Sequence, residues 1–313
     1  MSSVDPYFVV GMHTSFLIIG VLANVFILIV NFQDWLKTYD FNPSMLIINT
    51  IALINILFQG ATTFNEISSS MFVEFYIQGV AKAMLVILPS LAFSSLWCST
   101  CLCFYYCIKI VNFSGFFFYK LKAKIHALVP WLLIISVAVS WLFGVLGYWD
   151  LYMDIKSATA LTAHNATLTF SFNPESRCKC LFQIYMFFAS LAFVLILITA
   201  GSVLTSLSKH MIQMKKNNEG SGNSRIQSHL SAAKTVTSLL LLYSIFYVCL
   251  SSLINDVKNR GSLMSVLTII VVCSFPTFNS IVLIMGNRRL SNSLKKLLGN
   301  PPGANTEVTV ATY

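Results

Sequence analysis

Long apolar stretches separated by short charged segments make up most of the chain. Seven intervals contain no Asp, Glu, Lys or Arg and are mainly apolar: Pro6–Gln33, Phe41–Asn65, Ala83–Ile108, Ile125–Trp149, Cys180–Ser208, Thr235–Asn255 and Gly261–Asn287. Each has at least 21 residues, and a helix of about 20 apolar residues crosses a bilayer. The pattern predicts membrane-spanning helices at about residues 8–32, 44–65, 83–108, 127–149, 180–208, 235–255 and 262–286.

Two other segments complete the predicted organisation. Ser157–Pro174 carries no charge but is rich in Ser, Thr and Ala, so it lacks the sustained apolarity of a lipid-facing helix and is predicted to be a loop. After the seventh span, leucines recur at helical spacing at 290, 294, 297 and 298, among Arg288, Arg289, Lys295 and Lys296. We expect an amphipathic helix at about 288–298 on the inner membrane surface; a helix packed only on protein is the alternative.

Composition places the chain among membrane proteins. Of its 313 residues 56% are hydrophobic and only 10% charged, whereas about a quarter of the residues of a soluble protein are charged. This excludes a large soluble domain. The predicted fold class is an all-α membrane protein, a seven-transmembrane helix bundle over residues 1–302, followed by a disordered cytoplasmic tail at 303–313.

The distribution of basic residues predicts the orientation. With the N-terminus outside, the inner segments carry 14 of the 20 Lys and Arg residues, and cytoplasmic loops are enriched in these residues. The C-terminus is therefore expected in the cytoplasm. No Lys or Arg precedes the first span and no small-residue cleavage site follows it, so this span should remain in the mature protein.

The sequence lacks the usual signs of transport or catalysis. The span centres hold no charged residue, which argues against an ion-coupled pump, and no catalytic, phosphate-binding or metal-ligand motif is present. We therefore expect no enzyme activity, no cofactor and no metal. The net charge of +9 lies at the ends of spans and gives no indication of nucleic-acid binding. His13 and the six cysteines inside spans are expected to be packed core residues.

Uncharged polar side chains do enter the spans. Asn24, Asn49, Asn55, Asn279 and Ser280 cannot be satisfied by hydrocarbon and should bond to one another or to water. Two interpretations remain open: these residues hold helices together, or they form a network whose partners change between two states. Likewise, the prolines at 89 and 276 either bend their helices beside a cavity or are simple packing kinks.

One outer loop carries an acceptor site for glycosylation. Asn165-Ala166-Thr167 matches the acceptor pattern and lies between the fourth and fifth spans, on the predicted outer side. The matching triplet Asn112-Phe113-Ser114 lies on the predicted inner side. We expect only Asn165 to be modified.

Taken together, the local motifs resemble the type 2 taste receptors, the bitter-sensing family of G-protein-coupled receptors. The residues that carry the resemblance are Asn24-Val25-Phe26-Ile27, Val30-Asn31 and Asp34-Trp35-Leu36-Lys37; Leu96-Trp97, Thr100-Cys101-Leu102, Phe104-Tyr105 and Lys109-Ile110; Lys209-His210 and Met214; Ala233-Lys234-Thr235-Val236-Thr237-Ser238 and Leu240-Leu241-Leu242-Tyr243; and Pro276, Ser280 and Gly286-Asn287.

The resemblance implies a multi-pass receptor of the plasma membrane that binds small, fairly hydrophobic bitter compounds and activates a heterotrimeric G protein, leading to calcium release. It points to a ligand site lined by Leu88, Ala92, Phe93, Phe246 and Ile269, with Ile184, Tyr185, Phe188 and Glu66 as further candidates that could instead face lipid or core. It places Tyr105, Tyr106, Lys109, Lys209, His210, Met214 and Lys234 toward the G protein, although topology alone could explain the lysines.

Two positions depart from the family pattern. Asn55 stands where the family commonly has Arg, and Asn279 where it commonly has His. These two asparagines could form a neutral substitute for the family's polar switch. The chain is therefore expected to be a divergent member. A vomeronasal type 1 receptor, or more remotely a channel or carrier, remains the alternative.

Overall fold

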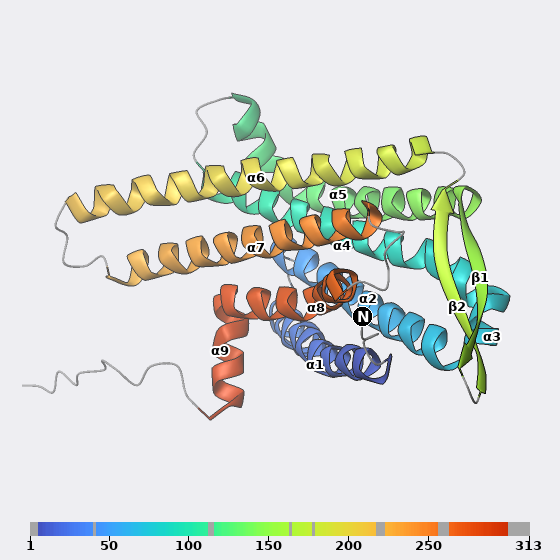
Figure 1. Ribbon diagram of the computed structural model, residues 1–313. Helices are drawn as coiled ribbons and strands as arrows, with labels where there is room; N and C mark the ends of the chain where they lie inside the picture. The colour runs from blue at the N-terminus through green and yellow to red at the C-terminus, as the bar shows by residue number, and fades with distance from the viewer. Residues whose placement is uncertain are drawn as a thin grey trace, which may run out of the picture.

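Helices dominate the computed structural model, and most of them run along the axis of one bundle (Figure 1). The structure describes residues 6–39, 42–111, 116–162, 165–176, 179–216, 223–255 and 263–299. Within these residues, seven helices are long and apolar enough to cross a membrane, which confirms the predicted class of a seven-transmembrane helix bundle. The predicted tail at 303–313 lies outside the described residues.

The elements follow the order of the predicted spans. They are α1 (Pro6–Thr38), α2 (Pro43–Met71), α3 (Val73–Phe75), the π-helical turn η1 (Tyr76–Val80), α4 (Ala81–Ile110), α5 (Phe116–Asp150), β1 (Leu151–Thr162), β2 (Asn165–Ser176), α6 (Lys179–Lys216), α7 (Asn223–Asn255), α8 (Leu263–Gly286) and α9 (Arg288–Leu297). The third span is thus α4, extended at its start by η1 and α3.

Local sequence signals explain where two helices begin. At the start of α2, the Asn42 side chain accepts a hydrogen bond from the Ser44 backbone N–H at 3.3 Å, and Pro43 occupies the first helical position. At the start of α9, Asn287 accepts from the Arg289 N–H at 3.0 Å. Asn is a favoured N-cap because its side-chain oxygen satisfies a free backbone donor, and proline suits the first turn.

Helix α4 occupies the centre of the bundle. It contacts α2, α5 and α6, while α1 lies beside α2 and α8, and α7 lies between α6 and α8. Most of its central residues are buried, from Ser90 to Leu96 without interruption. The outward faces of the peripheral helices carry exposed large hydrophobic residues instead, as expected where lipid is the solvent.

The segment predicted as a loop between the fourth and fifth spans has regular structure, so that prediction was wrong in secondary structure. β1 and β2 pair antiparallel, from Leu151 opposite Ser176 to Thr162 opposite Asn165. Apolar and polar residues alternate over residues 168–173 (LTFSFN), a period that favours strands, and Thr and Phe are good strand formers. The hairpin and α9 lie at opposite ends of the bundle (Figure 1).

The two ends of the bundle are called the hairpin end and the α9 end after these elements. The hairpin end contains the start of α4, the end of α5 and the start of α6. The α9 end contains the end of α4, the start of α7 and the end of α8.

Candidate functional site

An aromatic cluster joins α4, α5 and α6 toward the hairpin end. The rings of Phe93 and Tyr185 stack with centroids 5.6 Å apart, and Phe143 lies 5.7 Å from Tyr185 and 4.6 Å from Phe188. The Tyr185 hydroxyl donates a hydrogen bond to the backbone carbonyl of Phe143. The structure thus brings together three predicted ligand-site residues, Phe93, Tyr185 and Phe188, with Phe143, which the sequence reasoning missed.

A second aromatic group joins α6, α7 and α8. Phe246 stacks on Phe275 at 4.0 Å, and Phe193 stacks on Tyr247 at 4.6 Å with the rings nearly parallel. The Tyr247 and Ser190 hydroxyls are 2.6 Å apart and hydrogen-bonded. Of these residues, the sequence reasoning identified only Phe246. Aromatic residues at helical spacing are too common in membrane spans to have marked the others.

The remaining predicted ligand-site residues differ in exposure. Ala92 is buried, whereas Leu88, Ile269 and Glu66 are partly buried. The Ser70 hydroxyl lies 3.4 Å from Glu66 Oε1 and donates to it. Glu66 therefore already has a local partner on its own helix.

Ile184 belongs to an exposed stripe along α6. Its side chain is 41% exposed, and the exposed residues Phe187, Leu191, Val194 and Ile198 follow it on α6. Spacings of three and four residues place side chains on one helix face. This position favours lipid contact for Ile184, the alternative that the sequence left open.

Three lysines lie at one level of the α9 end. Cys107, Leu207 and Val236 pack in one small buried cluster between α4, α6 and α7. Lys109 follows Cys107 by two residues, and Lys209 follows Leu207 by two. Lys234 precedes Val236 by two. Each lysine therefore lies on the side of this cluster that is nearer the α9 end, and all three are exposed. The structure thus places these three lysines, which were predicted to face the G protein, at one level of the bundle on α4, α6 and α7.

The other predicted residues at this end lie close to Lys109. Its Nζ is 5.6 Å from the centroid of the Tyr105 ring, and Tyr105 and Tyr106 are adjacent, with centroids 5.9 Å apart. The Tyr105 hydroxyl donates to Asn42 Oδ1 at 3.4 Å, which ties α4 to the start of α2. The side chains of His210 and Met214 lie outside the described residues, as does Asn165's.

Three of the predicted intramembrane polar residues, Asn24, Asn55 and Asn279, belong to two separate groups. On one side Asn55 Nδ2 donates to Asn24 Oδ1 at 3.4 Å, joining α2 to α1. On the other, the Tyr243 hydroxyl donates to Asn279 Oδ1 at 3.1 Å and also bonds Ser99, joining α7 to α8 and α4. Asn55 and Asn279 therefore have different partners.

Ser280 and Asn49 make their own bonds. The Ser280 hydroxyl donates to the carbonyl of Pro276 at 2.7 Å, and Asn31 Nδ2 donates to Asn49 Oδ1 at 2.6 Å. His13 is buried, as predicted.

A third polar junction was not predicted. Gln59 Nε2 donates to Thr277 Oγ1 at 2.5 Å and to the carbonyl of Phe16 at 3.1 Å, and Thr277 donates to the same carbonyl at 3.0 Å. This junction joins α1, α2 and α8. Gln59 lies in an uncharged apolar interval, so the criterion that singled out Asn55 would also have found it.

The geometry defines a class of protein. In the described part of the chain, seven helices able to cross a membrane have aromatic contacts between them toward one end, exposed lysines at one level toward the other, and polar bonds between helices in the middle. No group of three or more His, Cys, Asp or Glu side chains in the described ranges could hold a metal ion. This is the architecture of a seven-helix membrane receptor.

Comparison with known proteins identifies the family. The family described as Taste receptor protein (TAS2R) matches residues 1–301. The chain is 27% identical over 281 residues to taste receptor type 2 member 39 of Homo sapiens, covering 90% of this chain and 83% of the relative. It is 29% identical over 285 residues to taste receptor type 2 member 9 of Pongo pygmaeus, covering 90% of each. Member 9 of Macaca mulatta is likewise 29% identical, over 287 residues.

The chain therefore belongs to the taste receptor type 2 family. It is a bitter taste receptor and a multi-pass membrane protein of the G-protein-coupled class. This family is not an enzyme family, and membership decides against the vomeronasal alternative.

Proposed function

We propose that this receptor binds small, fairly hydrophobic extracellular compounds at the hairpin end and activates a heterotrimeric G protein through the α9 end, leading to calcium release. The N-terminus and the β1–β2 hairpin are extracellular in this proposal, and the C-terminus is cytoplasmic. It is a protein of the plasma membrane. The basic residues near the α9 end support this orientation through the positive-inside rule.

The observation that carries the ligand site is the pair of stacked aromatic contacts toward the hairpin end. Phe93 stacked on Tyr185 joins α4 to α6, and Phe246 stacked on Phe275 joins α7 to α8. Such surfaces hold a ligand mainly by shape and stacking, with few hydrogen bonds. Leu88, Ala92, Phe188, Ile269 and Glu66 complete the proposed lining.

The proposal for the α9 end rests on the grouped lysines. Lys109, Lys209 and Lys234 are exposed at one level of the bundle, and Lys109 lies beside Tyr105. His210 and Met214 belong to the same surface in the proposal. A change of helix packing caused by ligand would open this surface to the G protein.

A calcium assay tests the ligand site. The receptor is expressed with a promiscuous taste-type G-protein chimera and exposed to varied bitter compounds. Phe246→Ala is expected to raise the half-maximal concentration of an active compound about tenfold, because a stacked ring contributes roughly 1 kcal/mol or more. Its neighbour Ile245 is exposed, so Ile245→Ala is the matched control. Leu88→Trp, which narrows the proposed site, provides a second variant.

The same assay tests coupling. Lys109→Gln should lower the maximal response while leaving ligand potency at equal surface expression largely unchanged. Lys122→Gln removes an exposed charge from α5 near the same end and should have little effect. Equal losses in both variants would show that the lysines serve topology alone. Ion or solute flux that persists without any G protein would favour a channel or carrier instead.

A further inference from the structure

A buried histidine in the first half of α1 has no hydrogen-bond partner. The His13 side chain is 3% exposed, and neither of its ring nitrogens is hydrogen-bonded within the described residues. Most buried polar side-chain atoms are hydrogen-bonded, so an unpaired imidazole in the interior needs an explanation. His13 belongs to none of the three polar junctions in the middle of the bundle.

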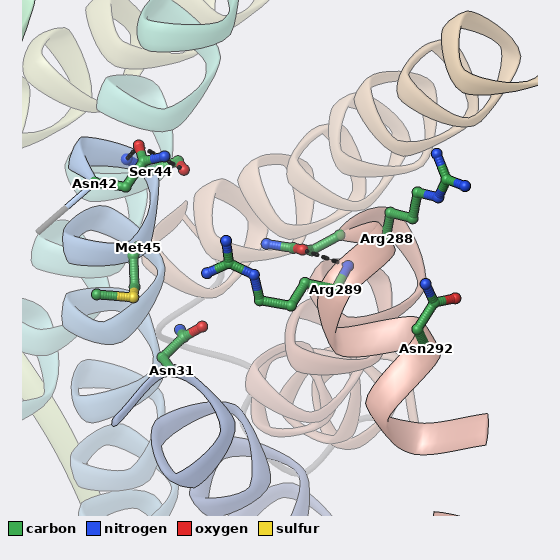
Figure 2. A pocket seen from close by; sticks show the side chains of 8 residues that line it. Asn31, Asn42, Ser44, Met45, Arg288, Arg289 and Asn292 are labelled. Atoms are coloured by element: carbon green, nitrogen blue, oxygen red, sulfur yellow. Dashed lines mark hydrogen bonds between the residues drawn. The ribbon is translucent and has the colours of Figure 1, made fainter. Parts of the chain in front are cut away.

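Three contacts define how α1 faces α2 along the bundle. They join Asn31 to Asn49, Asn24 to Asn55, and Gly20 to Gln59. The first lies at the α9 end, where Asn31 and Met45 line one cavity (Figure 2). At the third, a Cβ on Gly20 would overlap the Gln59 side chain, so the two helices are close there. Residue numbers fall along α1 as they rise along α2, as expected for antiparallel neighbours.

The same register places His13 opposite Glu66. His13 precedes Gly20 by seven residues, and Glu66 follows Gln59 by seven. Residues seven apart lie on one face of a helix, since seven residues make almost two turns. His13 and Glu66 therefore lie on the facing sides of α1 and α2, one heptad nearer the hairpin end than the contact between Gly20 and Gln59.

Glu66 is the acidic residue on the helices that surround His13. α1 packs on α2, α8 and α9. α2 contributes Glu66, and α8 contributes the buried thiol of Cys273, one turn nearer the hairpin end than Thr277. The contact with α9 lies at the opposite end of α1. On α1 itself, residues 6–33 contain no charged side chain.

Glu66 is only loosely held by its present partner. The carboxylate is partly buried, and its Oε1 accepts from the Ser70 hydroxyl at 3.4 Å, whereas an O–H···O hydrogen bond is usually about 2.5–3.0 Å long. The axes of packed helices are roughly 8–10 Å apart. A histidine and a glutamate on facing sides can meet across this distance by changing rotamers.

One proton would remove the net charge of this site. With a neutral imidazole, an ionised Glu66 is a single negative charge in a partly buried position, and a buried charge without a partner is costly. A proton taken up by the pair cancels that charge, whether it resides on the imidazole nitrogen or on the carboxylate oxygen. Either arrangement forms a strong hydrogen bond between the two groups.

We propose that His13 and Glu66 form an acid-sensitive contact between α1 and α2. At neutral pH the contact is open, as in the structure. When the solution at the hairpin end is acidified, the pair takes up one proton, which the imidazole and the carboxylate share, and the new bond ties α1 to the end of α2. Acid would also withdraw Glu66 from the ligand, a consequence that alone rests on the proposed function.

Thermal unfolding at two pH values tests the contact. The purified full-length receptor is unfolded in detergent at about pH 7.5 and about pH 5.5, on either side of the ordinary titration of histidine, and tryptophan fluorescence reports the midpoint. Because the folded state would bind the shared proton more tightly than the unfolded state, the added stability is present at the acidic pH and is lost as the pH rises.

Two single substitutions and their combination measure this added stability. His13→Gln and Glu66→Gln keep a polar side chain at each position but cannot share a proton. At the acidic pH each should lower the midpoint by about 2–4 °C, and the double variant should lower it no further than either single change. At the neutral pH the two effects should simply add.

Two exposed residues provide matched controls. His126→Gln removes an imidazole from α5, and Glu74→Gln removes a carboxylate from α3; neither should alter the pH dependence of the midpoint. Exchanging the two residues of the pair, His13→Glu with Glu66→His, should restore the added stability at the acidic pH. This exchange also serves as the second test if a single variant folds poorly.

Additive effects of His13→Gln and Glu66→Gln at the acidic pH, or equal coupling at both pH values, would overturn the proposal. So would a pH dependence of the native midpoint that His13→Gln leaves unchanged. The assay contains neither bitter compound nor G protein. A missing calcium response would therefore count against the proposed function alone, and a failed unfolding result against the acid-sensitive contact alone.

Discussion

At the scale of single residues, the two asparagines that depart from the family pattern have different hydrogen-bond partners. Asn55, at the position where the family commonly has Arg, bonds Asn24 on α1. Asn279, where it commonly has His, bonds Tyr243 on α7. Asn55 Oδ1 and Asn279 Nδ2 are buried without a hydrogen-bond partner among the described residues. No direct bond between the two asparagines is found there, and their role as a substitute for the family's polar switch stays a prediction.

Tyr243 connects three helices through its side chain. Its hydroxyl bonds Ser99 on α4 and Asn279 on α8, and its ring packs on Phe275 at 5.4 Å. Tyr243 is fully buried. Any change in the relative positions of α4, α7 and α8 must break or remake these bonds.

Tyr243→Phe should therefore destabilise the receptor modestly. The variant keeps the ring but removes the hydroxyl, and hydrogen bonds between membrane helices contribute about 0.6 to 1.7 kcal/mol. We expect the midpoint of thermal unfolding to fall by about 2–4 °C. A dye that reacts with thiols on unfolding measures this, because Cys98, Cys103 and Cys273 are buried.

The control for this variant is Tyr119→Phe. Tyr119 is 75% exposed. Its hydroxyl makes no hydrogen bond within the described part of the chain, so the substitution breaks none there. An unchanged midpoint for both variants would show that the Tyr243 bonds contribute nothing to stability.

At the scale of elements, the close contact between α4 and α5 depends on Gly144, which has no side chain. A Cβ on Gly144 would overlap the Ser90 hydroxyl and come within 2.8 Å of the Val86 carbonyl oxygen. Small residues let membrane helices approach closely. The Val86 carbonyl already accepts a hydrogen bond from the Ser90 hydroxyl at 2.7 Å, so both groups that a new Cβ would meet are held in place.

Gly144→Ala should separate these two helices locally. The Val86 backbone cannot move aside as easily as the end of a flexible side chain can. We therefore expect the free energy of unfolding to fall by about 1–3 kcal/mol, the usual effect of overpacking. Adding Ser90→Ala should recover only part of it, since the Val86 carbonyl remains. The same thiol-reactive assay measures all variants.

Gly201→Ala is the matched control, because nothing lies within 4 Å of a Cβ built there. It should be neutral or slightly stabilising, since alanine is the better helix former. If Gly144→Ala were as stable as Gly201→Ala, that result would contradict the close approach of α4 to α5 at Gly144.

At the scale of the whole molecule, the orientation in the membrane can be tested at the hairpin. Asn165 is the first residue of β2, paired opposite Thr162, at the tip of a hairpin that lies at the far end from α9. Residues placed beyond the membrane surface on the lumenal side are accessible for glycosylation.

We expect Asn165→Gln to abolish glycosylation of the receptor, seen as a mobility shift that glycosidase treatment of the native protein reproduces. Asn112→Gln alters the triplet on the predicted cytoplasmic side and should leave the shift intact. Loss of the shift in Asn112→Gln but not in Asn165→Gln would reverse the orientation.

The sequence by itself determined the number of spans, their approximate bounds and the presence of α9. The physical reason is that apolar length and charge are local properties, and the bilayer imposes the same length on every span. The family motifs were local as well. They identified the class of receptor because they are short runs with fixed spacing.

Only the tertiary structure decided which side chains meet. Asn24, Asn55, Asn279 and Tyr243 were all visible as polar residues in apolar spans, but their pairing depends on the rotation and depth of each helix, which no single segment encodes. The hairpin was missed because the alternation of apolar and polar residues is short, at residues 168–173, and lies in a segment whose Ser, Thr and Ala content is typical of a loop. The stacking of Phe93 on Tyr185 and the common level of Lys109, Lys209 and Lys234 likewise depend on how segments distant in the sequence pack against one another.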